Sequence, residues 1–420
     1  MRIINCKITK NIKNLQSILN VRRDGRNINT SIVPRILKNI KSTKNIAVRR
    51  YERKFGNNNK IKPSVIEIKK SIKKLDPEIK KAIDFAYSRI FKFHKLQKTK
   101  NIKYLDKYSN IIEHKYVPIN SLGIYIPANL PSSLLMNAIP AKIAQVKRIV
   151  LANPRTNGQL NPAVMYVAKK CGIKEIINVS GAQAIGSLAY VQKVDKIVGP
   201  GSDYVARAKK EVFGTVGIEG MIAGPSEVTV IADKSTNVDQ VATSMIAQSE
   251  HGENSQSILV TKDLNIIKKT KKKIDEYLKY SERKNIIKRS LKRNGIFILA
   301  KSDNQICDIV NIIAPEHLEI ILKKYNKYLD KIYNAGSIGV GEYSPVAASD
   351  YNVGTNHTLG TLGSSKFASG LNLNDFYKKI SIFKLSKKGI EVIGKKAITL
   401  ADYEKLPSHS LSIKSRMKNN

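Results

Sequence analysis

The sequence has few cysteines and no long apolar run. Its 420 residues include three cysteines, Cys6, Cys171 and Cys307, whose scattered positions match neither a disulfide framework nor a cysteine-type metal site. No uninterrupted apolar stretch is long enough to span a bilayer, and the opening MRIINCKITKN lacks the apolar core of an export signal. We therefore expect a cytoplasmic protein with no membrane partner, large enough for two or more domains.

Acidic residues are also scarce, because 33 Asp and Glu stand against 74 Lys and Arg and the formal net charge is +41. This balance is typical of nucleic-acid-binding proteins, which is the alternative function that we consider. However, the lysines are interleaved with Ile and Asn, as in KKTKKKIDEYLKYSERKNIIKRSLKR at 268–293, which favours solvated helix faces. No zinc-finger spacing or aromatic RNA-binding motif accompanies them. We expect salt-sensitive association with polyanions, but no specific nucleic-acid partner.

Short apolar runs alternate with amphipathic segments from about Leu122 to Gly341, which is the pattern of βα units. The expected strands are LGIYI, RIVLA, EIINV and DKIV in a first set, and EVTVIAD, SILVT, GIFILA, HLEII and SIGVG in a second. Each set predicts a parallel sheet that binds ligands at the carboxyl ends of its strands. The first hundred residues read as helical, and the clearest helix begins at Asp76-Pro77-Glu78.

We predict an α/β fold with two parallel-sheet, Rossmann-like domains that lack the usual glycine fingerprint G-x-G-x-x-G. Turns at Gly181 and Gly199 each follow a strand and open a helix, so their amides could meet a phosphate, but such turns are equally typical of any parallel α/β protein. The expected parts are a helical N-terminal region at 1–120 whose later part packs on the second sheet domain, a first α/β domain at 121–225, a second at 226–372, and a C-terminal tail at 373–420.

Four of the six histidines lie in clusters with carboxylate or amide side chains. The clusters are IAQSEHG with Gln248 and His251, APEHLE with Glu316 and His317, SDYNVGTNH with Asp350 and His357, and EKLPSH with Glu404 and His409. Histidine is the commonest metal ligand and titrates near neutral pH, so the clusters indicate a metal or proton-transfer site. The segment NVDQVATSMIAQSEH predicts a helix with Gln248 and His251 on one face. We expect the remaining histidines, His94 and His114, on the surface.

A series of longer strings follows one another over about 121–410. They are GIYIPAN, SGAQAIGSLAY, DKIVGPG, AGPSEVTVIAD, QSEHGENSQ, APEHLEI, AGSIGVGEYSPVAASDYNVGTNHTLGT and ADYEKLPSHS. In order and approximate spacing these strings resemble the histidinol dehydrogenase family. The resemblance implies a zinc-dependent, four-electron oxidation of L-histidinol to L-histidine through L-histidinal, with two NAD reduced, as the last step of histidine biosynthesis. It also implies a homodimer in which the tail of one chain completes the zinc site of the other, and a tail too small for its own core fits that arrangement.

The resemblance assigns roles to the clustered residues. One zinc ion per subunit is expected on Gln248, His251, Asp350 and His409. Glu316 and His317 are the expected catalytic residues: the histidine takes the alcohol proton, and the glutamate activates the water that hydrates the aldehyde. Water is the expected nucleophile because Cys171 lies outside the clusters. The expected substrate-binding residues are Ser226, Gln248, His251, His317, Asp350, His357, Glu404 and His409, although His357 could equally be a packed core histidine.

The expected NAD contacts are Tyr125, Gln183 and Ser202. The family usually has asparagine at the last of these positions. Because serine reaches less far, we expect a change in NAD affinity rather than in reaction type. The segment IEGMIAGPSE also looks about one residue longer than the family's form. A degenerate, inactive paralogue is disfavoured, since every expected zinc-binding and acid-base residue is present.

Overall fold

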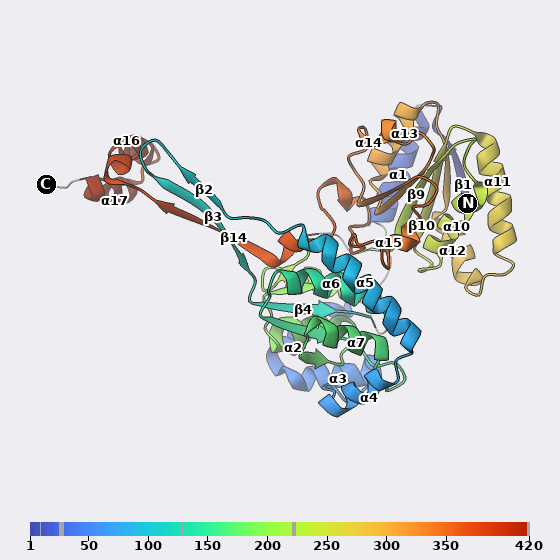
Figure 1. Cartoon of the computed structure of the whole chain (residues 1–420), viewed down its shortest axis with the longest axis horizontal. Helices are drawn as coiled ribbons and strands as arrows, with labels where there is room; N and C mark the ends of the chain where they lie inside the picture. Colours follow the sequence, from blue (N-terminus) through green and yellow to red (C-terminus); the bar gives the residue numbers. More distant parts are fainter. Residues whose placement is uncertain (9, 25–28, 128, 221–223, 418–420) are drawn as a thin grey trace.

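The chain forms two parallel β-sheets, each between layers of helices, and a long arm that extends from them (Figure 1). The computed structural model describes residues 1–8, 10–24, 29–127, 129–220 and 224–417. The segment IEGMIAGPSE, which looks about one residue longer than the family's form, includes residues 221–223, which lie outside the described residues. None of the described helices combines the length and the apolar character that a membrane span requires.

The first sheet has five parallel strands in the order β6-β5-β4-β7-β8. The strands are β4 Ser121–Tyr125, β5 Arg148–Ala152, β6 Glu175–Ile177, β7 Lys196–Val198 and β8 Gly217–Ile218. The helices that follow its strands are α6 Pro131–Ile143, α7 Pro162–Cys171, α8 Gly181–Gly186 with its π-helical continuation Ser187–Val191, and α9 Asp203–Val212. The four longer strands occur at the runs LGIYI, RIVLA, EIINV and DKIV. The expected parallel sheet is therefore confirmed.

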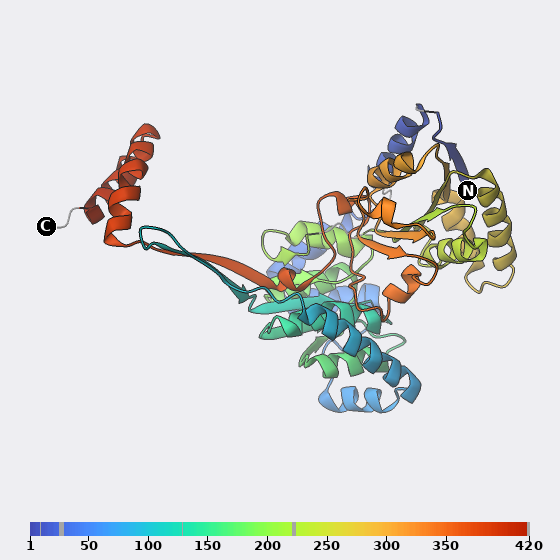
Figure 2. The same cartoon turned by 45° about the horizontal axis from the view of Figure 1, so that its top comes forward.

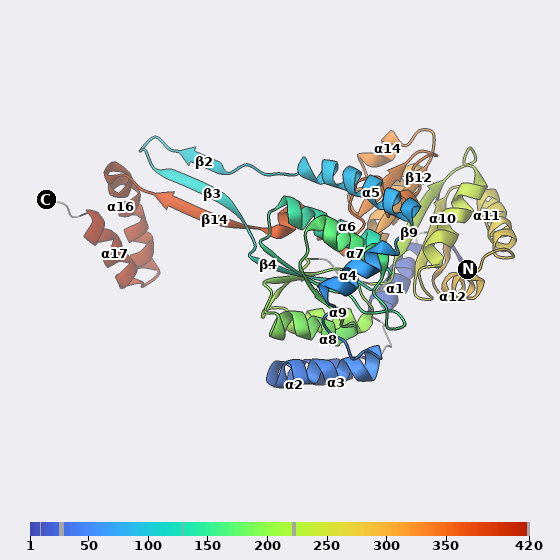
Figure 3. The same ribbon diagram turned by 60° about the horizontal axis from the view of Figure 1, so that its bottom comes forward.

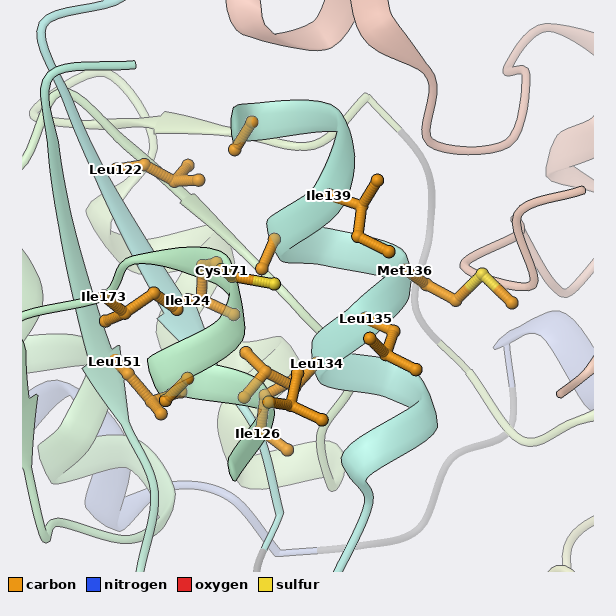
Figure 4. Close-up of a cluster of buried hydrophobic side chains, with 14 of the residues drawn as sticks. Leu122, Ile124, Ile126, Leu134, Leu135, Met136, Ile139, Leu151, Cys171 and Ile173 are labelled. Carbon is orange, nitrogen blue, oxygen red and sulfur yellow. The ribbon is translucent and has the colours of Figure 1, made fainter. Parts of the chain in front are cut away.

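Alternating side chains of β4 enter two different cores. Leu122 and Ile124 lie in a cluster with α6 and α7, which Figure 4 shows, and Tyr125 lies in the cluster on the opposite face. This is the period-2 alternation of a strand buried on both faces. Gly199, just after β7, has φ +115°, and an added Cβ would lie 2.0 Å from the Tyr125 carbonyl oxygen, so only glycine fits at this crossing.

The second sheet has six parallel strands in the order β1-β11-β10-β9-β12-β13. The strands are β1 Arg2–Asn5, β9 Glu227–Ala232, β10 Gln256–Thr261, β11 Ile296–Leu299, β12 His317–Ile321 and β13 Ser337–Val340. Its helices are α1 Lys10–Asp24, α10 Val238–Ser249, α11 Leu264–Tyr277, α12 Lys284–Asn294, α13 Asp303–Ile313, α14 Asn326–Leu329 and α15 Val346–Ser349. One face packs against α1 and α13, and the other against α10, α11 and α12.

The arm joins two segments that are far apart in the sequence. Strand β3 Ile111–Pro118 pairs antiparallel with β2 Ile102–Leu105 on one side and with β14 Tyr377–Lys384 on the other. Two short 3-10 turns, Ser364–Lys366 and Leu373–Phe376, lead into β14. Helices α16 Lys387–Tyr403 and α17 Pro407–Met417 lie at the far end of the arm, well away from both sheets (Figures 1 and 2).

The N-terminal region differs from the prediction of a helical 1–120 whose later part packs on the second sheet domain. Instead, its first part joins the second sheet, because β1 pairs with β11 and α1 packs beside it. Helices α2 Ile32–Thr43, α3 Asn45–Gly56, α4 Val65–Lys73 and α5 Pro77–Lys95 pack on the five-stranded sheet. Hydrogen bonds from Arg89 of α5 to the Asn352 and Val353 carbonyls, at 2.6 and 3.1 Å, connect this region to the second unit.

His94 is the second correction, because it is fully buried rather than at the surface. Its Nδ1 lies 2.9 Å from the Ile90 carbonyl oxygen, and its Nε2 lies 3.4 Å from Asn356 Nδ2. Desolvation lowers its pKa, which keeps the ring neutral. His94 is therefore a satisfied core histidine between α5 and the loop before His357, whereas His114 on the arm is exposed as expected.

Candidate functional site

A cavity of about 220 Å³ lies at the amino ends of β9 and β12 and brings most of the expected site residues together. The prediction that the second sheet binds its ligand at the carboxyl ends of its strands is therefore wrong, because Ser226, Glu316 and His317 stand where these strands begin. It is lined by Ser226, Gln248, His251, Glu316, His317, Asp350 and His357. Pro200 and Gly201 of the first sheet unit close its other side. The side chains come from four separate stretches of the chain, which the parallel topology brings to one edge of the sheet.

The side chains that line the cavity belong to residues at or near the ends of helices and strands. Ser226 immediately precedes β9, and His317 is the first residue of β12. Gln248 lies in the last turn of α10 and is 4% exposed. The predicted helix is shorter than expected, because α10 ends at Ser249 and His251 lies in the turn that follows. That turn stays wound, with the His251 amide 3.4 Å from the Gln248 carbonyl oxygen, so both side chains still line the cavity.

His317 is a neutral, buried base. Its side chain is 4% exposed, and its Nε2 lies 3.8 Å from both Glu316 Oε1 and Asp350 Oδ1. Desolvation lowers its pKa to about 3, with smaller contributions from His357 and His251. Its Nδ1 is buried and has no hydrogen-bond partner in the part of the chain that the structure describes. The ring can therefore take a proton from a group bound in the cavity.

Glu316 sits beside His317 and is held by the backbone of β9. Its Oε2 accepts a hydrogen bond from the Glu227 amide at 2.8 Å. Burial raises its pKa well above the ordinary value, and the nearby charges of Glu227 and Asp350 raise it further. A carboxyl group with a raised pKa is a stronger base once it is ionised, which suits the abstraction of a proton from water.

Asp350 and His357 are connected through the backbone. The Asp350 carbonyl oxygen lies 2.6 Å from His357 Nδ1, and since a carbonyl can only accept, Nδ1 carries the proton. His357 Nε2 is then an acceptor, 3.2 Å from Ser133 Oγ. The ring lines the cavity and is half-buried, so it is not a sealed core histidine. Burial raises the pKa of the Asp350 carboxyl to about 7, and no cationic side chain among the described residues offsets this effect.

Three charged residues beside the site were missed from the sequence: Glu227 and Glu319 are buried, and Arg22 is half-buried. Arg22 of α1 forms an ion pair with Glu227, whose Oε1 also accepts from the Leu362 amide at 3.1 Å. Glu319 on β12 is 2% exposed and accepts two hydrogen bonds. The strings AGPSE and APEHLE contain both glutamates and could have drawn attention to them. Nothing in the sequence around Arg22 indicates its role, because its partner lies 205 residues away.

The expected NAD contacts lie at the first sheet. Ser202 caps α9 in an extended conformation, makes no side-chain capping bond, and lines a cleft of about 1320 Å³ between the two sheet units. Tyr125 and Gln183 are buried, at 6% and 2% exposed, and do not line this cleft. Gln183 Nε2 donates to Glu52 Oε2 at 3.0 Å, and Glu52 of α3 also accepts from the Ser180 amide at 2.9 Å. Glu52 was not among the expected residues.

Glu404 and His409 are not near the cavity of their own chain. Glu404 caps the end of α16, His409 lies in α17, and both side chains are exposed. The two helices lie at the end of the arm (Figure 3). Within the described ranges, no three His, Cys, Asp or Glu side chains are grouped so as to hold a metal ion. The expected metal set has only His251 and Asp350 of these types at the cavity, because Gln248 is an amide and His409 lies on the arm.

Comparisons with known proteins agree on one family. A family model described as histidinol dehydrogenase matches residues 21–417. A histidinol dehydrogenase from Pelagibacter ubique is 50% identical over 100% of this chain and 99% of its own length. One from Carboxydothermus hydrogenoformans is 38% identical over 92% of this chain and 93% of its own. The crystal structure of histidinol dehydrogenase from Elizabethkingia anophelis, 36% identical, superposes with a TM-score of 0.92 over 99% of this chain and 98% of that one.

Proposed function

Because this chain belongs to the histidinol dehydrogenase family, we propose how its residues divide the work of the reaction between the two sheets. The chain is an NAD-dependent oxidoreductase of histidine biosynthesis. The family reaction converts L-histidinol to L-histidine through L-histidinal. One observation carries the proposed division: a neutral buried histidine and a buried glutamate are adjacent in one cavity with three further metal-type ligands.

The donor set suits a zinc ion. Gln248, His251 and Asp350 offer an amide oxygen, an imidazole nitrogen and a carboxylate at one cavity, and His409 of a second copy would supply a fourth ligand. The half-buried Asp350 carboxyl has no Lys or Arg partner among the described residues, and a bound cation would stabilise its ionised form. When bound, zinc would orient the nitrogen atoms of the substrate, since a mixed nitrogen and oxygen shell leaves coordination positions open.

His317 and Glu316 would carry the proton transfers. The neutral His317 ring would accept the proton of the substrate hydroxyl while the carbon that bears this hydroxyl gives up a hydride to NAD. The aldehyde must then gain an oxygen before it can lose a second hydride, so Glu316 takes a proton from the water that adds to it. His317 assists again when the resulting gem-diol is oxidised. Ser226 and His357 line the same cavity and would hold the substrate.

NAD would bind at the first sheet. We regard both sheet units as Rossmann-like, without the usual glycine fingerprint, and assign the cofactor to the carboxyl edge of the five-stranded one. Ser202 lines the cleft between the units and has a hydroxyl that is not used for capping. Tyr125 and Gln183 would support the turn at Gly181 rather than line the cleft. The Gly181 amide donates to the Tyr125 hydroxyl at 3.3 Å, and Gln183 Nε2 donates to Glu52 Oε2 at 3.0 Å.

The tail would act in a second copy of the chain. Glu404 and His409 are exposed on helices that stand away from their own cavity at the end of a three-stranded arm. We propose a homodimer in which α16 and α17 of one subunit reach the cavity of the other, where Glu404 would pair with the substrate ammonium group. We assign the enzyme to the cytoplasm, with L-histidinol as substrate and no specific nucleic-acid partner.

Anaerobic turnover of L-histidinol with NAD tests this division of work. We expect two NADH for each L-histidine, loss of turnover after chelation, and recovery when zinc is added back. A ratio of one NADH for each histidinol consumed would contradict the assignment of both oxidations to one cavity. Turnover that survives complete removal of metal would contradict the zinc ligand set.

A further inference from the structure

Glu319 is a buried carboxylate on the same face of β12 as His317. Side chains alternate along a strand, so His317 and Glu319 face α10, while Leu318 and Ile320 enter the core on the opposite face. Glu319 is 2% exposed and makes no ion pair in the part of the chain that the structure describes. Burying a carboxylate without a counter-charge costs folding free energy. A role in the site would explain why this position carries a glutamate.

Its two oxygens accept one hydrogen bond from each of two different elements. Ser244 Oγ of α10 donates to Oε2 at 2.6 Å, and the amide of Val346, the first residue of α15, donates to Oε1 at 2.7 Å. Ser244 lies four residues before Gln248 and therefore on the same face of α10. Val346 starts the short helix that ends immediately before Asp350. The carboxylate thus ties together the two elements that present Gln248 and Asp350.

The position of α15 also fixes His357. The Asp350 amide donates to the Val346 carbonyl oxygen at 3.2 Å, so Asp350 follows any movement of Val346. The Asp350 carbonyl oxygen in turn accepts from His357 Nδ1 at 2.6 Å. A shift at Val346 would therefore move one carboxylate and one imidazole of the cavity together.

We propose that Glu319 is a positioning residue that sets the distance between Gln248 and Asp350, and thereby the geometry of the metal site. The inference rests on the proposed zinc ligands. A carboxylate suits this task because both of its oxygens accept at once, whereas an amide offers one acceptor. Hydrogen bonds to a charged acceptor are also the stronger kind.

The test removes one of the two hydrogen bonds to Glu319 and leaves Glu319 itself unchanged. Ser244→Ala removes the donor on α10 and nothing from the cavity. Thr243→Ala is the matched control, because its hydroxyl is exposed and bonds within the same helix, to the Asp239 carbonyl at 2.8 Å. Ser244→Thr keeps a hydroxyl at the position. Zinc affinity is measured on the full-length apoenzyme by competition with a chromophoric chelator, and the Tm of the same apoprotein is recorded.

We expect Ser244→Ala to bind zinc about 10- to 100-fold more weakly than the wild type, the range seen when partners of metal ligands are removed. Thr243→Ala should match the wild type, and Ser244→Thr should recover most of the affinity. Glu319→Gln should also lose affinity, since one acceptor is gone.

Two results would overturn the inference. If Ser244→Ala lowers the apoprotein Tm but binds zinc as tightly as Thr243→Ala does, Glu319 only stabilises the fold. If the wild type itself binds no zinc, the proposed ligand set is wrong, and the positioning role falls with it. The first result leaves the proposed function intact, so the two failures can be distinguished.

Discussion

The five-stranded sheet at its carboxyl edge and the six-stranded sheet at its amino edge differ in how far their polar groups are already hydrogen-bonded. At the five-stranded sheet, Ser180 and Gln183 donate to one oxygen of Glu52 at distances of 2.9 and 3.0 Å. At the six-stranded sheet, His317 Nδ1 has no hydrogen-bond partner among the described residues, and Nε2 lies 3.8 Å from its nearest carboxylates. The polar groups of the turn at Ser180 thus already have partners, whereas those of His317 can still gain them. A catalytic acid or base needs such unpaired groups, because it must bind the proton that it transfers.

The largest effect is expected at the six-stranded sheet. His317→Ala should lower kcat for both oxidations by about 10²- to 10⁴-fold, the usual contribution of a general base. NAD binding should stay unchanged, because the substituted ring lies at the other sheet. The rate of NADH formation measures the loss in kcat, and a separate equilibrium titration measures NAD binding. A variant that keeps wild-type kcat would mean that His317 takes no proton.

Glu316→Gln should separate the two steps. The change keeps the size of the side chain and its acceptor for the Glu227 amide but removes the base. We expect histidinal to form at near the wild-type rate and its oxidation to fall about 10²-fold or more. Rapid-quench measurement of histidinal and histidine checks this. Equal loss in both oxidations would show that Glu316 is not specific to the water step.

Glu52→Ala tests the hydrogen-bonded turn at Ser180, at the carboxyl edge of the five-stranded sheet. The Ser180 amide and the Gln183 side chain would lose their acceptor, which costs about 1–3 kcal/mol of stability when donors are buried. We expect NAD to bind about tenfold more weakly, while kcat at saturating NAD is unchanged. Equilibrium NAD titration and thermal unfolding measure the two effects. Arg53→Ala, on the exposed side of the same helix, is the control and should show neither change.

The smallest effect is expected at Ser202, where the chain departs from the asparagine usual in the family. Ser202→Asn adds an amide at the cleft, and one extra hydrogen bond contributes about 0.5–1.5 kcal/mol. NAD affinity should therefore rise by roughly twofold to tenfold, with the histidinol KM unchanged. If NAD binds equally well or more weakly, this position does not contact the cofactor.

Local patterns predicted both sheets, because buried parallel strands appear as short apolar runs between helices. The clusters of His, Glu and Asp indicated residues that line the cavity, but its edge was predicted wrongly, since Ser226, Glu316 and His317 lie at the amino rather than the carboxyl ends of their strands. The arm could not be predicted, because β3 pairs with β14 about 260 residues later and neither segment shows strict alternation. The roles of Arg22, Glu52 and the N-terminal strand were missed for the same reason: their partners are distant in sequence.

The central claim is that the cavity of one subunit is completed by the tail of another. Mixing two inactive variants, His317→Ala and His409→Ala, tests it directly. In a swapped heterodimer, one cavity receives an intact body and an intact tail, so random reassembly should restore about one quarter of wild-type turnover. If every tail serves its own body, each cavity keeps one defect, and the mixture will stay as inactive as its components.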